Sequence, residues 1–254
     1  MNGVMQWVKS LLFTTYMMLS ACLFGLFMTL CFWLPHRAQF SIARCWARVL
    51  LAVLAATCGL RYVVEGRENV PTGNHIIMSN HTSAWETIAQ FVLFPPQVWV
   101  LKRELLWIPF VGWGLKLLRP IAINRGAGHR AVNQVIEQGS ERLAEGLWVI
   151  IFPEGTRVIA GRPRKYGVSG ALLATTTGKL VIPVSHNAGS FWSRRGLLKR
   201  PGAIRVVIGK PIDPAGKDPR ILNDEVRAAI EAGLARIEAT PQVGANPGAV
   251  ADPG

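Results

Sequence analysis

Charged residues are scarce in this chain, and acidic residues are the scarcest. Only 17% of the 254 residues are charged, whereas an average soluble domain has about 25%. The 28 Lys and Arg outnumber the 15 Asp and Glu, which gives a net charge of +13. Half of the residues are hydrophobic, which excludes a chain that is disordered throughout. An apolar and basic chain favours anionic membranes or phosphate-bearing ligands as partners, with nucleic acid as the competing interpretation.

Cysteine is also rare, and several common catalytic signatures are missing. The four cysteines form neither a C-x-x-C pair nor a metal-type spacing: Cys22, Cys31, Cys45 and Cys58. We therefore expect no disulfide framework and no zinc site. The sequence also lacks a G-x-S-x-G nucleophile elbow, a P-loop and an H-E-x-x-H motif.

The N-terminal region contains a long apolar segment. No charged side chain occurs from residue 10 to 35, and Leu11–Leu34 is almost entirely apolar. A helix needs about 20 such residues to span a bilayer, and Trp7 and Trp33 bracket the run as interfacial aromatics often do. A signal peptide is the alternative, but its apolar core is only about 7–15 residues and ends in small residues, unlike Phe32–Pro35. We expect a retained membrane anchor.

The charges around this segment predict its orientation. Lys9 precedes the segment, and several arginines follow it: Arg37, Arg44, Arg48 and Arg61. The excess of basic residues places the C-terminal side in the cytoplasm. A second apolar run, Val49–Leu60, is too short to span a membrane alone. With Ser41–Arg48 it forms either an amphipathic helix whose arginines face lipid headgroups or a buried core helix.

The rest of the chain alternates short β-prone runs with helical patterns. The runs are Arg61–Glu65, His75–Ser79, Gln97–Leu101, Pro120–Ile123, Leu147–Phe152, Leu180–Ser185 and Ala203–Ile208. Apolar residues at helical spacing predict helices over Arg130–Ala144 and Pro219–Ile237, the latter with Asp218 as its N-cap. This alternation predicts an α/β layered domain. The Pro-, Gly- and Ala-rich tail 240–254 is expected to be disordered.

A first candidate site follows the apolar run that ends at Ser79. His81 and Glu86 lie where a strand opens into a helix, the position at which α/β folds bind ligands. If Glu86 is in the first helical turn, it can hold one ring nitrogen of His81 and leave the other to take a proton from a hydroxyl. The alternative is that Ser83 and Glu86 form a capping box and that Glu86 only caps the helix.

A second candidate is the block Phe152–Arg157, which follows another apolar run. Gly155 permits a tight turn, Arg157 offers a planar fork that suits phosphate, and Glu154 can accept a hydrogen bond from a hydroxyl group. A strand-to-loop turn with a surface ion pair explains the same residues without a function.

Further basic and histidine residues follow other predicted strands. Lys102 and Arg125 are each expected just past a strand end, so they can converge on one anion, although most such residues are solvated surface charges. His186 follows a strand with an internal Pro183, which suits an edge or irregular strand, and is interpreted as structural. The basic stretch 194–200 can touch a membrane or an acidic partner, but a solvated loop is the more common explanation.

In this order, the motifs resemble those of the glycerolipid acyltransferase family. The family has a His-x4-Asp motif, a basic residue after a strand, a Phe-Pro-Glu-Gly-Thr-Arg block and a Val-Pro-containing strand. Their counterparts here are Asn80–Glu86, the segment from Lys102 to Arg125, Phe152–Arg157 and Val181–Val184. The sequence departs from the family in carrying Glu86 where Asp is usual; Glu still reaches the ring from the same helical turn.

The resemblance implies a fold and roles for particular residues. The fold is a mixed, mostly parallel sheet flanked by helices behind a membrane-bound N-terminal segment. His81 would be the general base and Glu86 its orienting acid. The phosphate would be held by Lys102, Arg125 and Arg157, and the acceptor by Glu154, Gly155 and Thr156. No metal or prosthetic group is implied, because the acyl donor is a thioester of coenzyme A or acyl carrier protein.

We therefore expect three regions: a membrane anchor over residues 1–60, an acyltransferase domain over 61–239 and a tail over 240–254. The expected reaction moves an acyl chain to lysophosphatidate in the inner membrane, with the catalytic domain on the cytoplasmic side. One alternative is another lysolipid acceptor, such as lyso-ornithine lipid. A second is a non-catalytic adaptor that binds anionic lipid, which would predict a broken His–acid pair. Nucleic-acid binding is not expected, because neither a basic helix nor an aromatic stacking platform is present.

Overall fold

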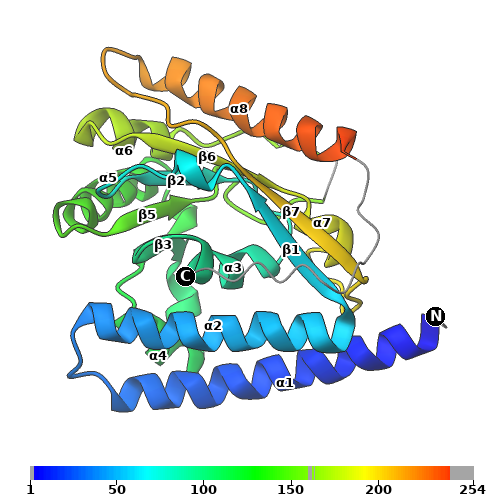
Figure 1. The fold of residues 1–254 in the computed structure, drawn as a ribbon. Coiled ribbons are helices and arrows are strands. Elements are labelled where there is room, and N and C mark those ends of the chain that lie inside the picture. The colour runs from blue at the N-terminus through cyan, green and yellow to red at the C-terminus, as the bar shows by residue number, and fades with distance from the viewer. Residues whose placement is uncertain (1–2, 160–161, 163, 241–254) are drawn as a thin grey trace.

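A seven-stranded sheet forms the centre of the protein (Figure 1). The computed structural model describes residues 3–159, 162 and 164–240, and of Arg125 the backbone only. The predicted disordered tail therefore lies almost entirely outside the described residues. The strands are β1 (Leu60–Glu65), β2 (Ile76–Ser79), β3 (Gln97–Lys102), β4 (Ile121–Ile123), β5 (Trp148–Ile151), β6 (Val181–His186) and β7 (Gly202–Ile208).

The sheet is mixed and mostly parallel, as the resemblance implied. Its strand order is β1-β7-β6-β2-β5-β3-β4. Five strands, from β6 to β4, run parallel to one another, whereas β7 pairs antiparallel with β6 and parallel with β1. All seven predicted β-prone runs are strands. Because parallel strands end at one edge of a sheet, the loops after β2, β5, β3, β4 and β6 gather there.

Helices cover both faces of the sheet and enclose two hydrophobic cores. One face carries α5 (His129–Ala144), α6 (Ser169–Thr177) and α8 (Pro219–Ala239). As predicted, α8 begins at Pro219 and has Asp218 as its N-cap. The other face carries α1 (Gly3–Leu30), α2 (His36–Cys58), α3 (Trp85–Leu93), α4 (Val111–Leu117) and α7 (Ala188–Phe191). Short 3-10 helices are η1 (Arg67–Asn69), η2 (Arg103–Trp107) and η3 (Arg125–Ala127). Strand β2 serves both cores, because Ile76 and Met78 point to one and Ile77 to the other.

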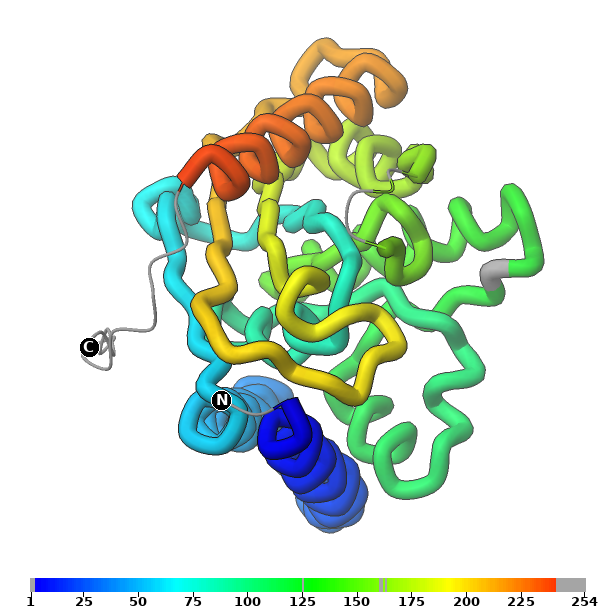
Figure 2. Tube along the Cα trace, turned by 90° about the vertical axis from the view of Figure 1, so that its right-hand side faces the viewer, coloured from blue at the N-terminus to red at the C-terminus, as the bar shows by residue number. Residues whose placement is uncertain are grey.

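The two N-terminal helices form a hairpin on the side of the molecule opposite α8 (Figures 1 and 2). Each is long and apolar enough to cross a membrane, so the expectation that the second segment is too short to span was wrong: α2 begins at His36, well before the apolar run. Helix α1 turns polar Gln6 and Ser10 toward the protein. Its outward side is apolar and exposed: Val4, Val8, Leu11, Leu12, Met18, Leu19, Leu23, Leu26, Phe27 and Leu30 among others.

Helix α2 also packs against the domain with one face. Phe40, Leu50 and Leu54 are buried in the same core as the sheet, so the core interpretation holds for that face. The expectation that its arginines face lipid headgroups was wrong for Arg44. Its guanidinium donates hydrogen bonds to the carbonyls of Phe91 (2.9 Å) and Phe94 (2.7 Å), where a cation stabilises the carboxyl end of α3.

Lys199 differs from the expected solvated loop. Its side chain is only 1% exposed, and its ammonium donates to the carbonyls of Ser10 and Leu197 and to the hydroxyl of Thr14. The ammonium also lies 4.7 Å from the ring centre of Trp192, a favourable cation–π distance. This buried lysine fastens α1 to the domain, and burial lowers its pKa.

Strand β6 is not an edge strand, although it contains Pro183. It lies between β2 and β7. The proline is tolerated because β7 pairs with β6 only from Val184 onward, and Pro183 contributes its carbonyl, which accepts from the amide of Gly209 at 2.8 Å. Its missing N–H therefore costs no bond in the pairing with β7.

Candidate active site

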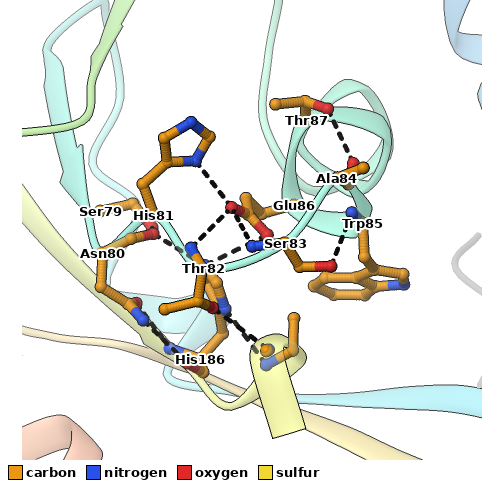
Figure 3. A network of polar contacts seen from close by, with 12 residues as sticks. Ser79, Asn80, His81, Thr82, Ser83, Ala84, Trp85, Glu86, Thr87 and His186 are labelled. Carbon is orange, nitrogen blue, oxygen red and sulfur yellow. Dashed lines mark hydrogen bonds and ion pairs between the residues drawn. The ribbon is translucent and has the colours of Figure 1, made fainter. Parts of the chain in front are cut away.

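The loop after β2 brings the predicted His–acid pair together (Figure 3). Nδ1 of His81 lies 2.7 Å from Oε1 of Glu86. The same oxygen accepts the backbone N–H groups of Thr82 (3.0 Å) and Ser83 (2.9 Å). Glu86 therefore bonds to backbone amides at the start of α3 and also contacts His81, so it does more than cap the helix; its part in catalysis stays a prediction.

The Glu86 carboxylate is fully enclosed yet remains ionised. Its side chain is almost completely buried, and burial alone would raise its pKa. The imidazole of His186, the hydrogen bond from His81 and the amide of Ser83 outweigh burial and hold the pKa of Glu86 below its ordinary value. An ionised acceptor at Oε1 means that Nδ1 of His81 carries the hydrogen, and its Nε2 is then the basic nitrogen.

The loop after β5 braces His81 from the side. The Phe152 ring stacks on the imidazole with ring centres 4.0 Å apart. The amide of Val158 donates to the carbonyl of His81 at 2.8 Å, and the amide of His81 donates to Oε1 of Glu154 at 3.3 Å. The two sequence motifs thus form one unit, because β2 and β5 are neighbours that end at the same edge.

The residues of the second motif have different surroundings. Glu154 is 6% exposed, and its Oε2 has no hydrogen-bond partner among the described residues. Burial raises the pKa of Glu154 to about 7, although the amide of His81 opposes the shift. Gly155 has a φ of +68°, which confirms the predicted tight turn. Thr156 is half-buried.

The basic residues are only partly brought together. Arg157 lines the same cavity as His81, and its Nε is buried without a partner among the described residues. The ammonium of Lys102 lies 3.5 Å from Glu104 at the surface. Arg125 follows β4 at the same sheet edge, but its side chain lies outside the described part of the structure. Their convergence on one anion stays a prediction.

An apolar cavity of about 320 Å³ opens beside the pair. The polar groups at its wall are His81, Thr87 and Arg157, and most of the remaining lining is apolar. That lining comes from helices α1, α2, α3 and α4, from strand β3, from η2, and from Leu118 and Phe152. The His81 side chain therefore lies at a site that suits a hydrocarbon chain.

Comparison with known proteins identifies the family. The Acyltransferase family model matches residues 61–198, which include both motifs and the strands that carry them. This protein belongs to the acyltransferase family. The enzyme is 40% identical over 94% of its length to a 1-acyl-sn-glycerol-3-phosphate acyltransferase of Pseudomonas aeruginosa, of which it covers 95%. It is also 28% identical over 72% of its length to a human 1-acyl-sn-glycerol-3-phosphate acyltransferase beta, of which it covers 68%.

A solved structure shares the fold of this acyltransferase. The crystal structure of a 1-acyl-sn-glycerophosphate acyltransferase from Thermotoga maritima superimposes with a TM-score of 0.80. The two sequences are 24% identical, and the match covers 96% of this chain and all of the other. The likeness extends through both N-terminal helices, which supports treating them as part of the fold.

Sequence reasoning missed two features beside the His81–Glu86 pair. The first is the cavity, because its walls come from α1 and α4, which are far from the motifs in sequence. The second is the position of His186 beside Glu86, because no acid is near His186 in sequence. Its Nε2 lies 3.9 Å from Oε2 of Glu86. The available signal was its position just after a strand, shared with His81.

Proposed function

We propose that the protein transfers a fatty acyl chain from an acyl thioester to the free hydroxyl of 1-acylglycerol 3-phosphate, giving phosphatidate. The observation that carries this proposal is a His81–Glu86 pair, with a buried acid, at an apolar cavity that Arg157 also lines. The relatives named as 1-acyl-sn-glycerol-3-phosphate acyltransferases support the choice of acceptor. The intact pair argues against a non-catalytic lipid adaptor.

The proposed chemistry needs one base and an activated donor. Nε2 of His81 takes the proton of the acceptor hydroxyl while that oxygen attacks the thioester carbonyl. The tetrahedral adduct then collapses, the C–S bond breaks, and the thiolate leaves and recovers a proton from the imidazolium. Glu86 holds the ring in one tautomer and stabilises its positive charge. No metal or prosthetic group takes part in these steps, and the thioester belongs to coenzyme A or acyl carrier protein.

The remaining groups are proposed to hold the substrates. The cavity takes an acyl chain, because its walls are apolar. Arg157, with Lys102 and Arg125 from neighbouring strand ends, binds the phosphate of the acceptor. Glu154, Gly155 and Thr156 shape the site of the glycerol group. A protonated Glu154 can donate to an oxygen of the acceptor, since its Oε2 has no partner among the described residues.

We also propose that the reaction takes place at a membrane surface. The outward side of α1 is apolar and exposed, which is the arrangement of a helix that contacts lipid. Residues 1–60 act as the anchor and residues 61–239 as the catalytic domain. The basic residues that follow the first helix favour the inner membrane, with the catalytic domain in the cytoplasm.

A panel of lysolipids tests the acceptor. Membranes containing the protein receive labelled acyl thioester and, separately, lysophosphatidate, lysophosphatidylglycerol and lyso-ornithine lipid. We expect labelled phosphatidate as the main product, and the variant Arg157→Lys is expected to raise the apparent KM for lysophosphatidate more than that for the thioester. A preference for an acceptor without a phosphate monoester would contradict the proposed substrate while leaving the role of His81 intact.

A further inference from the structure

His186 is a second histidine, and it is buried behind the catalytic pair. It ends strand β6, and its side chain is 2% exposed. Its Nε2 lies 2.9 Å from the carbonyl oxygen of Asn80, and its Nδ1 lies 3.3 Å from the amide nitrogen of Ala188. Because a backbone amide can only donate and a carbonyl can only accept, Nδ1 is the acceptor and Nε2 carries the hydrogen. The ring is thereby fixed in one neutral tautomer.

The hydrogen on this nitrogen lies close to the second oxygen of Glu86. Oε1 of Glu86 accepts three hydrogen bonds, but Oε2 is buried and accepts none among the described residues. Nε2 of His186 is 3.9 Å from Oε2. That distance is too long for a hydrogen bond, yet at low local polarity the positive end of an N–H dipole still stabilises a buried anion.

Asn80 ties the same histidine to the backbone that carries His81. The Asn80 side chain donates to the carbonyl of His186 at 2.9 Å and accepts from its amide at 3.0 Å. The His186 ring in turn donates to the carbonyl of Asn80. The peptide just before His81 is therefore held from both sides, as the lower part of Figure 3 shows.

We propose that His186 is a positioning residue for acyl transfer, whose neutral ring stabilises the ionised Glu86 and fixes the peptide that presents His81. The proposal rests on the proposed function in that His81 is taken as the base. His186 does not line the apolar cavity; it lines a second pocket of about 190 Å³, which Glu154 also lines. In the proposal it acts through Glu86 and not on the reacting atoms.

The burial of His186, weighed against the ionisable groups around it, favours the neutral form of its ring. Burial lowers the pKa of His186, although Glu86 and the carbonyl of Asn80 oppose the shift. The ionisable groups that act on Glu86 are His81 from its own loop, His186 from β6 and Glu154 from the loop after β5. If the N–H of His186 is removed, the Glu86 anion loses stabilisation, and the His81–Glu86 pair binds a proton at a higher pH.

Two substitutions separate this role from a merely structural one. His186→Leu removes the donor, and we expect kcat to fall about tenfold or more with little change in either KM, while the acidic limb of the pH–rate profile moves up by about one pH unit. His186→Gln can place an N–H near the position of Nε2, so its acidic limb should stay close to that of the wild type. Each profile is repeated with Glu154→Gln present, because Glu154 titrates in the same range.

The matched control is His75→Leu. His75 precedes β2 at the opposite edge of the sheet, and its Nε2 contacts the carbonyl of Thr72. This variant should keep the wild-type acidic limb. A His186→Leu enzyme that folds and keeps that limb, even with a lower kcat, would overturn the proposal, because a structural role predicts no change in the proton affinity of the pair.

A measurement on the wild-type chain keeps the proposal testable if His186→Leu fails to fold. Nitrogen-15 NMR of labelled histidine should show His186 protonated at Nε2 and unprotonated at Nδ1 from about pH 5.5 to 8.5. An imidazolium signal from His186 in that range would overturn the proposal. This result does not depend on the acceptor, so a failure of the lysophosphatidate assignment is recognised separately, by the lysolipid panel.

Discussion

At the residue scale, one carboxylate oxygen of Glu86 accounts for the arrangement of the candidate catalytic pair. Oε1 of Glu86 accepts from the His81 ring and from two backbone amides, so one acid both caps a helix and holds the imidazole of His81. The longer side chain of Glu, compared with the Asp usual in the family, still reaches both targets. The sequence spacing predicted this contact, because a strand end and the first helical turn are adjacent wherever a β-strand opens directly into a helix.

The raised pKa of Glu154 predicts that the stability of the folded protein depends on pH. Its pKa rises from 4.5 to about 7 in the folded protein, so the folded state binds more protons than the unfolded state between these values. Stability therefore falls as pH rises through this window, by about 3 kcal/mol in total. Gln at this position keeps an oxygen for the amide of His81 and cannot ionise. We expect Glu154→Gln to raise the Tm at pH 8 and to leave it nearly unchanged at pH 4.5.

The measurement is thermal unfolding of both proteins across this pH range in the same detergent. The gap between the two Tm values should open as pH rises above 4.5. If the plots of Tm against pH for the two proteins stay parallel, ionisation of Glu154 does not destabilise the folded state, which would contradict the prediction.

At the scale of elements, the strands were the most predictable part. Each is a short apolar run between polar or turn residues, and because both faces are covered, the runs stand out clearly. Helices α5 and α8 were predicted from their apolar stripes. Helices α4 and α6 were not, because they are short and rich in Gly or Thr. Sheet order and the reversed direction of β7 depend on contacts between distant strands, which local patterns do not encode.

The crossing of α1 and α4 leads to a prediction about Gly25. A Cβ atom at Gly25 would lie 2.3 Å from the carbonyl oxygen of Phe110, a backbone atom that cannot move aside cheaply. We expect Gly25→Ala to destabilise the protein by about 1–3 kcal/mol. The control is Gly3→Ala in the same helix, where nothing lies within 4 Å and where Ala should be neutral or stabilising.

Thermal unfolding of the two alanine variants distinguishes the causes. A lower Tm for Gly25→Ala with an unchanged or higher Tm for Gly3→Ala supports a close approach of the helices. Equal Tm values would show that α1 and α4 are farther apart than this packing requires. Because Gly25 also lines the apolar cavity, the chain length of the preferred acyl donor should change in Gly25→Ala alone.

At the scale of the whole molecule, the helices on the two sides of the sheet differ in the side chains that they expose. Helix α8 covers the sheet with an ordinary amphipathic face, whereas α1 turns the polar Gln6 and Ser10 inward and leaves many apolar side chains exposed. Phe13 and Met28 of α1 are also buried in the core shared with the sheet. Removing α1 would therefore damage the fold as well as the proposed anchor, so membrane binding is better tested by surface substitutions.

Lysine substitutions at equal exposure test the anchor. Leu12 and Leu19 on α1 are 64% and 62% exposed, and Ile221 on α8 is 63% exposed. We expect Leu12→Lys with Leu19→Lys to lower the fraction of protein that floats with anionic vesicles, because charges penalise insertion of an apolar face. Ile221→Lys should leave flotation unchanged. Equal flotation of the two variants would contradict lipid contact through α1.

The rate of phosphatidate formation by His81→Ala tests the central claim most directly. A general base contributes a factor of about 10²–10⁴, so the variant should lose at least about a hundredfold in rate while its Tm and vesicle binding stay at wild-type values. His75→Ala, at the other end of the same strand, serves as the control and should retain the wild-type rate. A folded His81→Ala enzyme that forms phosphatidate at close to the wild-type rate would contradict the assignment of the His81–Glu86 pair as the catalytic centre.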